Sequence, residues 1–175
     1  VNIRDQWYIF YHRHTNHSWY CRQGCAEPIT FQGEHIRQVE MTSCGLNGKP
    51  LKGKGTYPSY IACNLFTEKE EMYVGGENQP YIMRDGCDGD YDPAYITNLT
   101  DHATAGFKYF SCKDVKKIGI SVRGYARGEF EVRTAWDGSV CGKISVDFTN
   151  VWEYYEAPVK IDNGIQAIYL TFRGE

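Results

Sequence analysis

The feature that most constrains the fold is a recurring alternation of apolar and polar side chains with a period of two. It runs through KKIGISVRGY (116–125), GEFEVRTAW (128–136) and IQAIYLTFRG (165–174). This is the period of a half-buried β-strand, in which successive side chains point to opposite faces of a sheet. Helical spacing is weak throughout, and 18 glycines are spread along the chain. The pattern predicts an all-β fold, an antiparallel β-sandwich.

The first thirty residues predict a β-hairpin separate from the sandwich. Trp7, Ile9 and Tyr11 alternate with their neighbours, HTNH (14–17) suits a turn, and SWYCRQG (18–24) supplies the returning strand. Pro28 interrupts strand pairing, so we place a boundary within residues 29–36. A two-stranded hairpin is only marginally stable alone in water. We therefore expect this aromatic hairpin to pack against the sandwich.

Between these patterns, shorter segments predict further strands and loops. The expected strands are residues 37–43, 60–66, 80–85 and 107–112. Residues 45–58 are rich in Gly, Lys and Pro and predict a loop. Charged residues 67–72 predict a solvated turn, and residues 85–93 a polar loop.

Composition excludes several classes of function. A chain of 175 residues favours one domain of ordinary size. A net charge of −3 gives no electrostatic reason to expect nucleic acid or an anionic membrane as a partner. A run of about 18 apolar residues is lacking, so no transmembrane helix is expected. The N-terminus lacks a basic region followed by an apolar core, which predicts no signal peptide in this chain.

Cysteine usage leaves the redox state open. The seven cysteines are odd in number, so at least one is expected to stay free or to pair between chains. Cys21 and Cys25 are separated by three residues, which is not a CxxC spacing, and no second close pair completes a zinc site. Buried thiols or one or two scattered disulfides are the remaining readings.

An acidic loop is a candidate calcium site. Its four aspartates lie within eight residues: Asp85, Asp88, Asp90 and Asp92. Carboxylates at this spacing can converge on Ca²⁺ through hard oxygen ligands. The loop is not an EF-hand, because the twelfth position counted from Asp88 is Leu99 instead of Glu. A solvated turn is the alternative, since Asp and Gly are common in turns.

Recognisable catalytic motifs are lacking. The chain contains neither a GxSxG elbow, nor a P-loop, nor a dinucleotide-binding fingerprint. Glycoside hydrolysis requires two carboxyl groups placed across the scissile bond, and no pair here lies in a recognisable setting. We therefore expect that this chain is not itself an enzyme.

The aromatic segment TNVWEYYEAPV (149–159) is a candidate ligand surface. Trp152, Tyr154 and Tyr155 fall within four positions. Neighbouring side chains of a strand point to opposite faces, so at least one of the three is expected to be exposed. Trp and Tyr offer a rigid apolar plane with a polar handle, which suits the C–H face of a pyranose ring. Burial in the core is the alternative.

Two stretches resemble known families. QWYIFYHR followed by RQGCAEPI, about residues 4–30, resembles the closing blade of the five-bladed propeller of family 43 glycoside hydrolases. These enzymes are arabinofuranosidases and xylosidases that act on plant hemicellulose. The resemblance implies that the catalytic carboxylates lie upstream of this chain, and that residues 1–30 are a remnant hairpin of such a propeller.

The second stretch, about residues 36–175, resembles a family 6-like carbohydrate-binding module. The resemblance rests on RQVEMTS, PAYITNLTDHATAGFKYF, GEFEVRTAWDGSVCGKISV, VWEYYEAPV and GIQAIYLTFRG. It implies a jelly-roll-like β-sandwich whose end loops hold a sugar between a tyrosine and a tryptophan, here Tyr95 and Trp152. The family's final strand, with a cleft asparagine and a calcium-binding aspartate, has no counterpart in the sequence. The other acidic positions of that structural Ca²⁺ site fit Gln38 and Glu40.

These observations lead to three hypotheses. The first is a non-catalytic module that binds xylan, arabinoxylan or their oligosaccharides by aromatic stacking, through Trp152, Tyr95, Tyr154 and Tyr155. The second is a fragment or subunit of an active arabinofuranosidase or xylosidase, completed by an upstream catalytic domain. The third is an interaction domain that binds a protein. The first two imply a secreted, extracellular setting.

Overall fold

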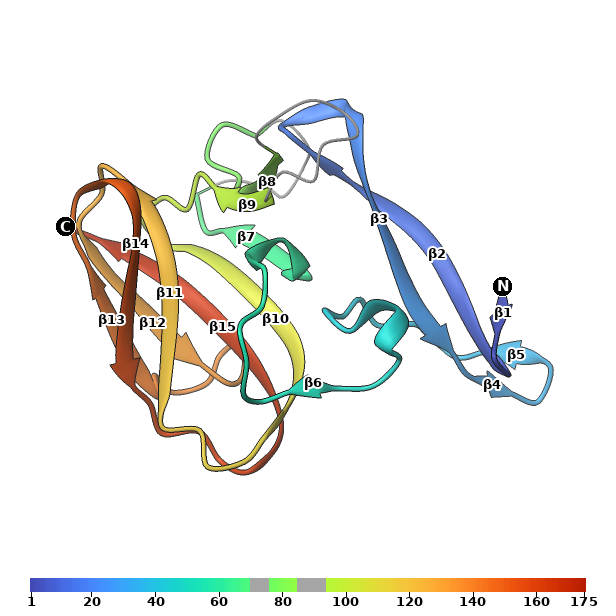
Figure 1. The fold of residues 1–175 in the computed structure, drawn as a ribbon. Coiled ribbons are helices and arrows are strands. Elements are labelled where there is room, and N and C mark those ends of the chain that lie inside the picture. The colour runs from blue at the N-terminus through green and yellow to red at the C-terminus, as the bar shows by residue number, and fades with distance from the viewer. Residues whose placement is uncertain (70–75, 85–93) are drawn as a thin grey trace.

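The computed structural model describes residues 1–69, 76–84 and 94–175, and its regular structure is almost all β-strand (Figure 1). The predicted all-β class is confirmed. The elements in chain order are β1 (Asn2–Ile3), β2 (Gln6–Thr15), β3 (Ser18–Ile29), β4 (Phe31–Gln32), β5 (His35–Ile36), η1 (Gly45–Asn47), β6 (Leu51–Lys52), η2 (Ser59–Ile61), β7 (Asn64–Thr67), β8 (Tyr81–Arg84), β9 (Ala94–Thr97), β10 (Ala103–Cys112), β11 (Lys117–Gly124), β12 (Gly128–Arg133), β13 (Gly142–Val146), β14 (Thr149–Pro158) and β15 (Gly164–Gly174). In the described part of the chain, no helix is long and apolar enough to cross a bilayer.

The sandwich has two layers. The larger sheet has the order β13–β12–β15–β10–β6, and β7 also pairs with β10. The smaller layer is the antiparallel pair β11–β14, which lies across the larger sheet in Figure 1. The core between them is apolar, and Val132 and Ile144 within it are fully buried. Ile118, Ile120 and Val122 pack against it from β11, so the predicted alternation does place one face of this strand inward.

Strand β15 is buried on both faces. Ile168, Leu170 and Phe172 belong to the core. On the opposite face, Tyr169 and Thr171 are also buried. Thr171 shares a hydrogen bond of 2.8 Å between its hydroxyl and that of Thr104 on β10. A central strand between β12 and β10 therefore lies under side chains on both sides of the sheet.

Strands β2 and β3 form the predicted N-terminal hairpin. Its turn is formed by Asn16 and His17, whose φ angles are 56° and 51°. Two successive residues with positive φ are typical of the type I′ turn, whose twist matches that of the flanking strands. The expected turn in HTNH is thus confirmed, and a short β4–β5 pair occupies the expected boundary region. The division into domains at this boundary stays a prediction.

The hairpin is attached to the sandwich through loops. The buried Glu27 carboxylate accepts hydrogen bonds from the Thr42 backbone N–H (2.6 Å), the Thr42 hydroxyl (2.7 Å) and the Tyr11 hydroxyl (3.2 Å). Arg13 donates to the carbonyl oxygens of Tyr60, at 2.5 Å, and Ala62. The hairpin therefore packs on the body, as expected. It does so against loop segments and, at its turn, against β8 through Asn16. Among the described residues it does not pair with an edge of either sandwich sheet (Figure 1).

Two of the expected strands are wrong in whole or in part. Residues 37–43 form no strand, because their backbone groups find other partners: the Thr42 N–H donates to Glu27, and the Ser43 N–H donates to the Lys108 carbonyl. In the segment 60–66, η2 comes first and β7 begins only at Asn64. Residues 85–93, and 70–72 of the expected turn, lie outside the described residues.

The cysteines of the described ranges are all free. They are Cys21, Cys25, Cys44, Cys63, Cys112 and Cys141, and Cys87 lies outside those ranges. Burial raises the pKa of the Cys63 and Cys112 thiols, which keeps them protonated and weakly reactive. The sequence left open whether the cysteines are buried thiols or form disulfides. Cys63 and Cys112 are buried thiols.

Candidate functional site

An irregularity between β11 and β14 creates the candidate site. In this ladder Val122 lies opposite Glu153, and Gly124 lies opposite Thr149. Arg123 is therefore the single residue of β11 that faces the three residues 150–152 of β14. Such a bulge increases the local twist and redirects side chains. Here it places the Arg123 and Trp152 side chains next to each other on the outer face of the small sheet.

Tyr95 of β9 completes this contact. The Tyr95 and Trp152 ring centroids are 5.3 Å apart, and the ring planes make an angle of 71°. The structure thus brings together the tyrosine and tryptophan that the sequence singled out. The rings are in edge-to-face contact, so in this arrangement they are not two parallel walls with a sugar-sized space between them.

The remaining two aromatic residues of the segment lie on different faces of β14. Tyr154 is 62% exposed on the outer face, two residues after Trp152, which is 49% exposed. Its ring lies over Gly119, where an added Cβ would fall 2.1 Å from the Tyr154 hydroxyl oxygen. Tyr155 points inward and packs against the core. The expectation that the three cannot all be core residues is confirmed.

The charges of this face are unevenly distributed. The Arg123 guanidinium carbon lies 5.2 Å from the centre of the Trp152 ring and 6.0 Å from that of Tyr95. At the far end of β11, Lys117 forms an ion pair with Glu156. The hydrogen bond from Lys117 lowers the pKa of the Glu156 carboxyl group. On the inner face, Tyr155 donates a hydrogen bond of 3.0 Å to Glu153.

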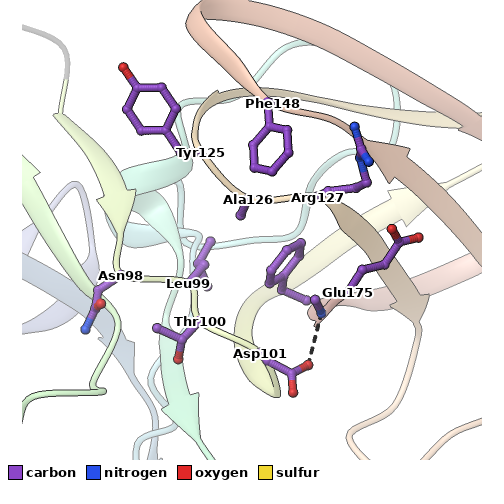
Figure 2. A pocket seen from close by; sticks show the side chains of 11 residues that line it. Asn98, Leu99, Thr100, Asp101, Tyr125, Ala126, Arg127, Phe148 and Glu175 are labelled. Atoms are coloured by element: carbon purple, nitrogen blue, oxygen red, sulfur yellow. Dashed lines mark hydrogen bonds between the residues drawn. The ribbon is translucent and has the colours of Figure 1, made fainter.

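A cavity of about 380 Å³ opens in the loops that follow β9 and β11 (Figure 2). Its walls include the exposed ring of Tyr125 and the ring of Phe148, which Arg127 covers at 5.0 Å. Arg127 is also paired with Asp147 at 2.9 Å. The hydroxyl oxygen of Thr100 is buried in the wall without a hydrogen-bond partner among the described residues. The cavity adjoins the aromatic face along the chain, since Tyr125 is two residues beyond Arg123.

The predicted calcium ligands do not converge in the described part of the chain. Gln38 is exposed. Glu40 accepts hydrogen bonds from the Lys108 ammonium (2.8 Å) and the Tyr109 hydroxyl, and the Lys108 bond lowers its pKa. Among the described residues, no three His, Cys, Asp or Glu side chains come together to hold a metal ion. Gln38 and Glu40 as they stand thus do not fit a calcium ion by themselves.

The second calcium candidate lies elsewhere in the sequence. Its residues, Asp85, Asp88, Asp90 and Asp92, all lie outside the described residues. Calcium binding stays a prediction for both candidates, and metal titration is its test.

An exposed tryptophan on the larger sheet of the sandwich was missed by sequence reasoning. Trp136 follows β12, is 50% exposed, and makes edge-to-face contacts with Phe66 at 5.2 Å and Tyr169 at 5.6 Å. This cluster covers the outer face of the larger sheet. Arg123 was missed as well, because the bulge that directs it toward Trp152 depends on the pairing of two distant strands. The only signal in the sequence was its place beside Gly124.

Comparisons with known proteins agree with these features. No protein-family model matches the chain. A xylosidase/arabinosidase of Thermoclostridium stercorarium is 54% identical over 181 aligned positions, which cover 99% of this chain and 38% of that protein. The chain therefore spans less than half the length of this curated relative.

Two solved structures share the fold. One is a family 6 carbohydrate-binding module from Clostridium stercorarium in complex with cellobiose: TM-score 0.58, 17% identity, 73% of this chain and 90% of that one. The other is a family 43 arabinoxylan arabinofuranohydrolase from Bacillus subtilis in complex with cellotetraose: TM-score 0.62, 16% identity, all of this chain and 37% of that one. The chain thus has the fold of a family 6 carbohydrate-binding module and of part of a family 43 glycoside hydrolase, which is the resemblance that the sequence predicted.

Proposed function

We propose that this chain is a non-catalytic module that binds hemicellulose, namely xylan, arabinoxylan or their oligosaccharides. The observation that carries the proposal is the pair of exposed rings, Trp152 and Tyr154, on one face of β14 beside Tyr95. Each of the two rings offers an apolar plane with a polar edge. Such planes match the C–H faces of successive sugar rings.

The ring geometry favours stacking on top of this face. Because Tyr95 meets Trp152 edge-on, a pyranose has no slot between them and must lie over the part of the Trp152 ring that Arg123 and Tyr95 leave exposed. Residues at i and i+2 of a strand are about 7 Å apart, so Trp152 and Tyr154 offer platforms to neighbouring sugar residues. Stacking with a few exposed hydrogen bonds gives weak binding, with a Kd on the order of 10⁻⁵–10⁻³ M.

The choice of hemicellulose rests on the relatives. The name xylosidase/arabinosidase describes a protein that is 54% identical to this chain. One structural neighbour is an arabinoxylan arabinofuranohydrolase. In a longer protein of this kind, a binding module would hold the catalytic domain close to insoluble substrate. Its setting would be extracellular, where plant cell-wall polysaccharide is found.

Affinity electrophoresis on xylan, arabinan and β-glucan tests this proposal. We expect xylan to retard the chain, and we expect Trp152→Ala and Tyr154→Ala to abolish most of that retardation. Trp136→Ala removes an equally exposed tryptophan from the other sheet and should leave retardation unchanged. Retardation that survives Trp152→Ala and is lost in Trp136→Ala would contradict the proposed site. Failure on every glycan would contradict the function and favour a protein-binding domain.

A second candidate function is that of a subunit or fragment of an active glycosidase. The hairpin favours it, because it exposes the large apolar side chains of Trp7 (45%), Phe10 (51%) and Trp19 (60%) along β2 and β3. An apolar surface of this kind is typical of a face that another domain covers. A catalytic domain joined upstream would be the partner.

Nitrophenyl arabinofuranoside and xyloside assays, with intact-mass measurement of native material, test this second candidate. We expect no turnover by the isolated 175 residues, and a larger mass for an active species. Turnover by the isolated chain would contradict the expectation that it carries no catalytic site.

A further inference from the structure

Arg123 is placed unlike the other exposed stacked arginine of the described residues. Its guanidinium lies over the rings of both Trp152 and Tyr95, at 5.2 Å and 6.0 Å. Arg127 likewise lies over a ring, that of Phe148, but its charge is paired with Asp147. No such carboxylate partner lies within ion-pair distance of Arg123 in the described parts of the chain. Among the described residues, the aromatic face thus carries beside Trp152 a positive charge that is not paired with a carboxylate.

A stacked guanidinium remains available to a ligand. A cation–π contact uses the charge of the guanidinium, and its N–H groups can still donate hydrogen bonds to a carboxylate. Arg is the side chain best suited to bind a carboxylate, because two parallel N–H groups match its two oxygens. The bulge at residues 122–124 holds this donor beside the Trp152 platform.

We propose that the face formed by Trp152, Tyr154, Tyr95 and Arg123 prefers glycans that carry a uronic acid, with the uronate carboxylate bound by Arg123. This inference rests on the proposed function, since it names the kind of hemicellulose that the same face selects. A neutral sugar stacks on Trp152, and an adjacent acidic sugar directs its carboxylate to the guanidinium. The preferred ligand is therefore an acidic xylan chain instead of an unsubstituted one.

Isothermal titration with three matched ligands tests the proposal. They are xylotetraose, xylotetraose with one glucuronosyl branch, and the methyl ester of that branched compound, which keeps the shape and removes the charge. We expect the acid to bind roughly five- to tenfold more tightly than the ester, as for a charge-assisted bond at an exposed site. The preference should weaken as salt is raised.

Two variants separate carboxylate binding from a role in holding the rings. Arg123→Gln should bring the acid and the ester to equal affinity, and Arg123→Lys should retain part of the preference. An arginine that only positions Trp152 would instead weaken all three ligands by the same factor, which would overturn the inference. Lys117→Gln is the matched control for net charge, since Lys117 lies on the same strand about 20 Å away, beyond the reach of screened charges.

The outcomes distinguish this inference from the function on which it rests. Equal binding of acid and ester by the unmodified chain would overturn the uronate preference and leave hemicellulose binding intact. Binding of none of the three ligands would overturn both. Tighter binding of the acid, lost in Arg123→Gln and kept in Lys117→Gln, would establish the preference.

Discussion

The hairpin and the sandwich are held in place by different interactions. The sandwich buries a continuous apolar core between two sheets, with Val132 and Ile144 fully buried. The hairpin instead leaves Trp7 and Phe10 half exposed and is tied to the body by polar groups, chiefly the buried Glu27 carboxylate and the Arg13 guanidinium. Buried apolar area stabilises a fold by itself, whereas buried polar groups contribute only while all their partners are present. The sandwich is thus the stable unit, and the hairpin depends on what it contacts.

The largest expected difference is in the free energy of unfolding when the same substitution, isoleucine to alanine, is made in the sandwich and in the hairpin. Ile144→Ala deletes fully buried methylene and methyl groups and should lower the free energy of unfolding by about 3 kcal/mol. Ile9→Ala makes the same deletion at a hairpin position that is 42% exposed and should cost less than about 1 kcal/mol. Urea denaturation followed by tryptophan fluorescence measures both. Similar losses in the two variants would contradict the distinction drawn between the regions.

Removing the charge of Glu27 should loosen the hairpin without unfolding the sandwich. Glu27→Gln replaces a carboxylate that accepts three hydrogen bonds, and it should cost about 2 kcal/mol of local stability. Hydrogen exchange should then accelerate at the amides of β2 and β3 while the β12 and β15 amides stay protected. Glu34→Gln, at an exposed position, is the control. Uniform acceleration across both regions would show that they unfold as one unit.

Lowering the pH should destabilise the protein by protonating Glu131 on the outer face of the larger sheet. Burial raises the pKa of this carboxyl group, but hydrogen bonds from Arg133 and Arg173 outweigh burial and set its pKa below the usual value. A carboxyl group whose pKa is lowered by folding contributes stability above its unfolded pKa of about 4.3 and loses it as the pH falls through the folded pKa. Between pH 5 and pH 3, the free energy of unfolding of the unmodified chain should thus fall by about 1 kcal/mol more than that of Glu131→Gln. Thermal unfolding at each pH measures the difference. Parallel pH profiles would contradict this.

The smallest effect on stability is expected at Gly119. The three atoms nearest to an added Cβ all belong to the outer end of the Tyr154 ring, which can move, so Gly119→Ala should change the free energy of unfolding by less than about 1 kcal/mol. It should nevertheless displace Tyr154 and weaken glycan binding several-fold. Gly24→Ala in the hairpin, where an added Cβ meets nothing within 4 Å, should change neither property. Unchanged binding in Gly119→Ala would remove Tyr154 from the site.

The features that the sequence predicted correctly are those that depend on residues close together in the chain. Period-two alternation identified β11, β12 and β15, and the HTNH turn identified the hairpin, because both depend on neighbouring residues. Residues 37–43 were wrongly predicted to be a strand. Two of their backbone N–H groups donate hydrogen bonds to distant partners, the Glu27 carboxylate and a carbonyl of β10, which the local sequence does not reveal. The spacing of Trp152, Tyr154 and Tyr155 predicted that at least one of them is exposed, and Trp152 and Tyr154 are. Arg123 and Trp136 were missed, since only strand pairing shows which rings they touch.

The claim that the outer face of β11–β14 binds glycans is tested most directly by an NMR titration that follows tryptophan indole N–H signals. The four tryptophans, Trp7, Trp19, Trp136 and Trp152, give four such signals. Titration with xylohexaose should shift the Trp152 signal saturably, with a Kd on the order of 10⁻⁵–10⁻³ M. The other three should stay in place. A saturable shift of Trp136 with Trp152 unchanged, or no shift at millimolar ligand, would contradict the account.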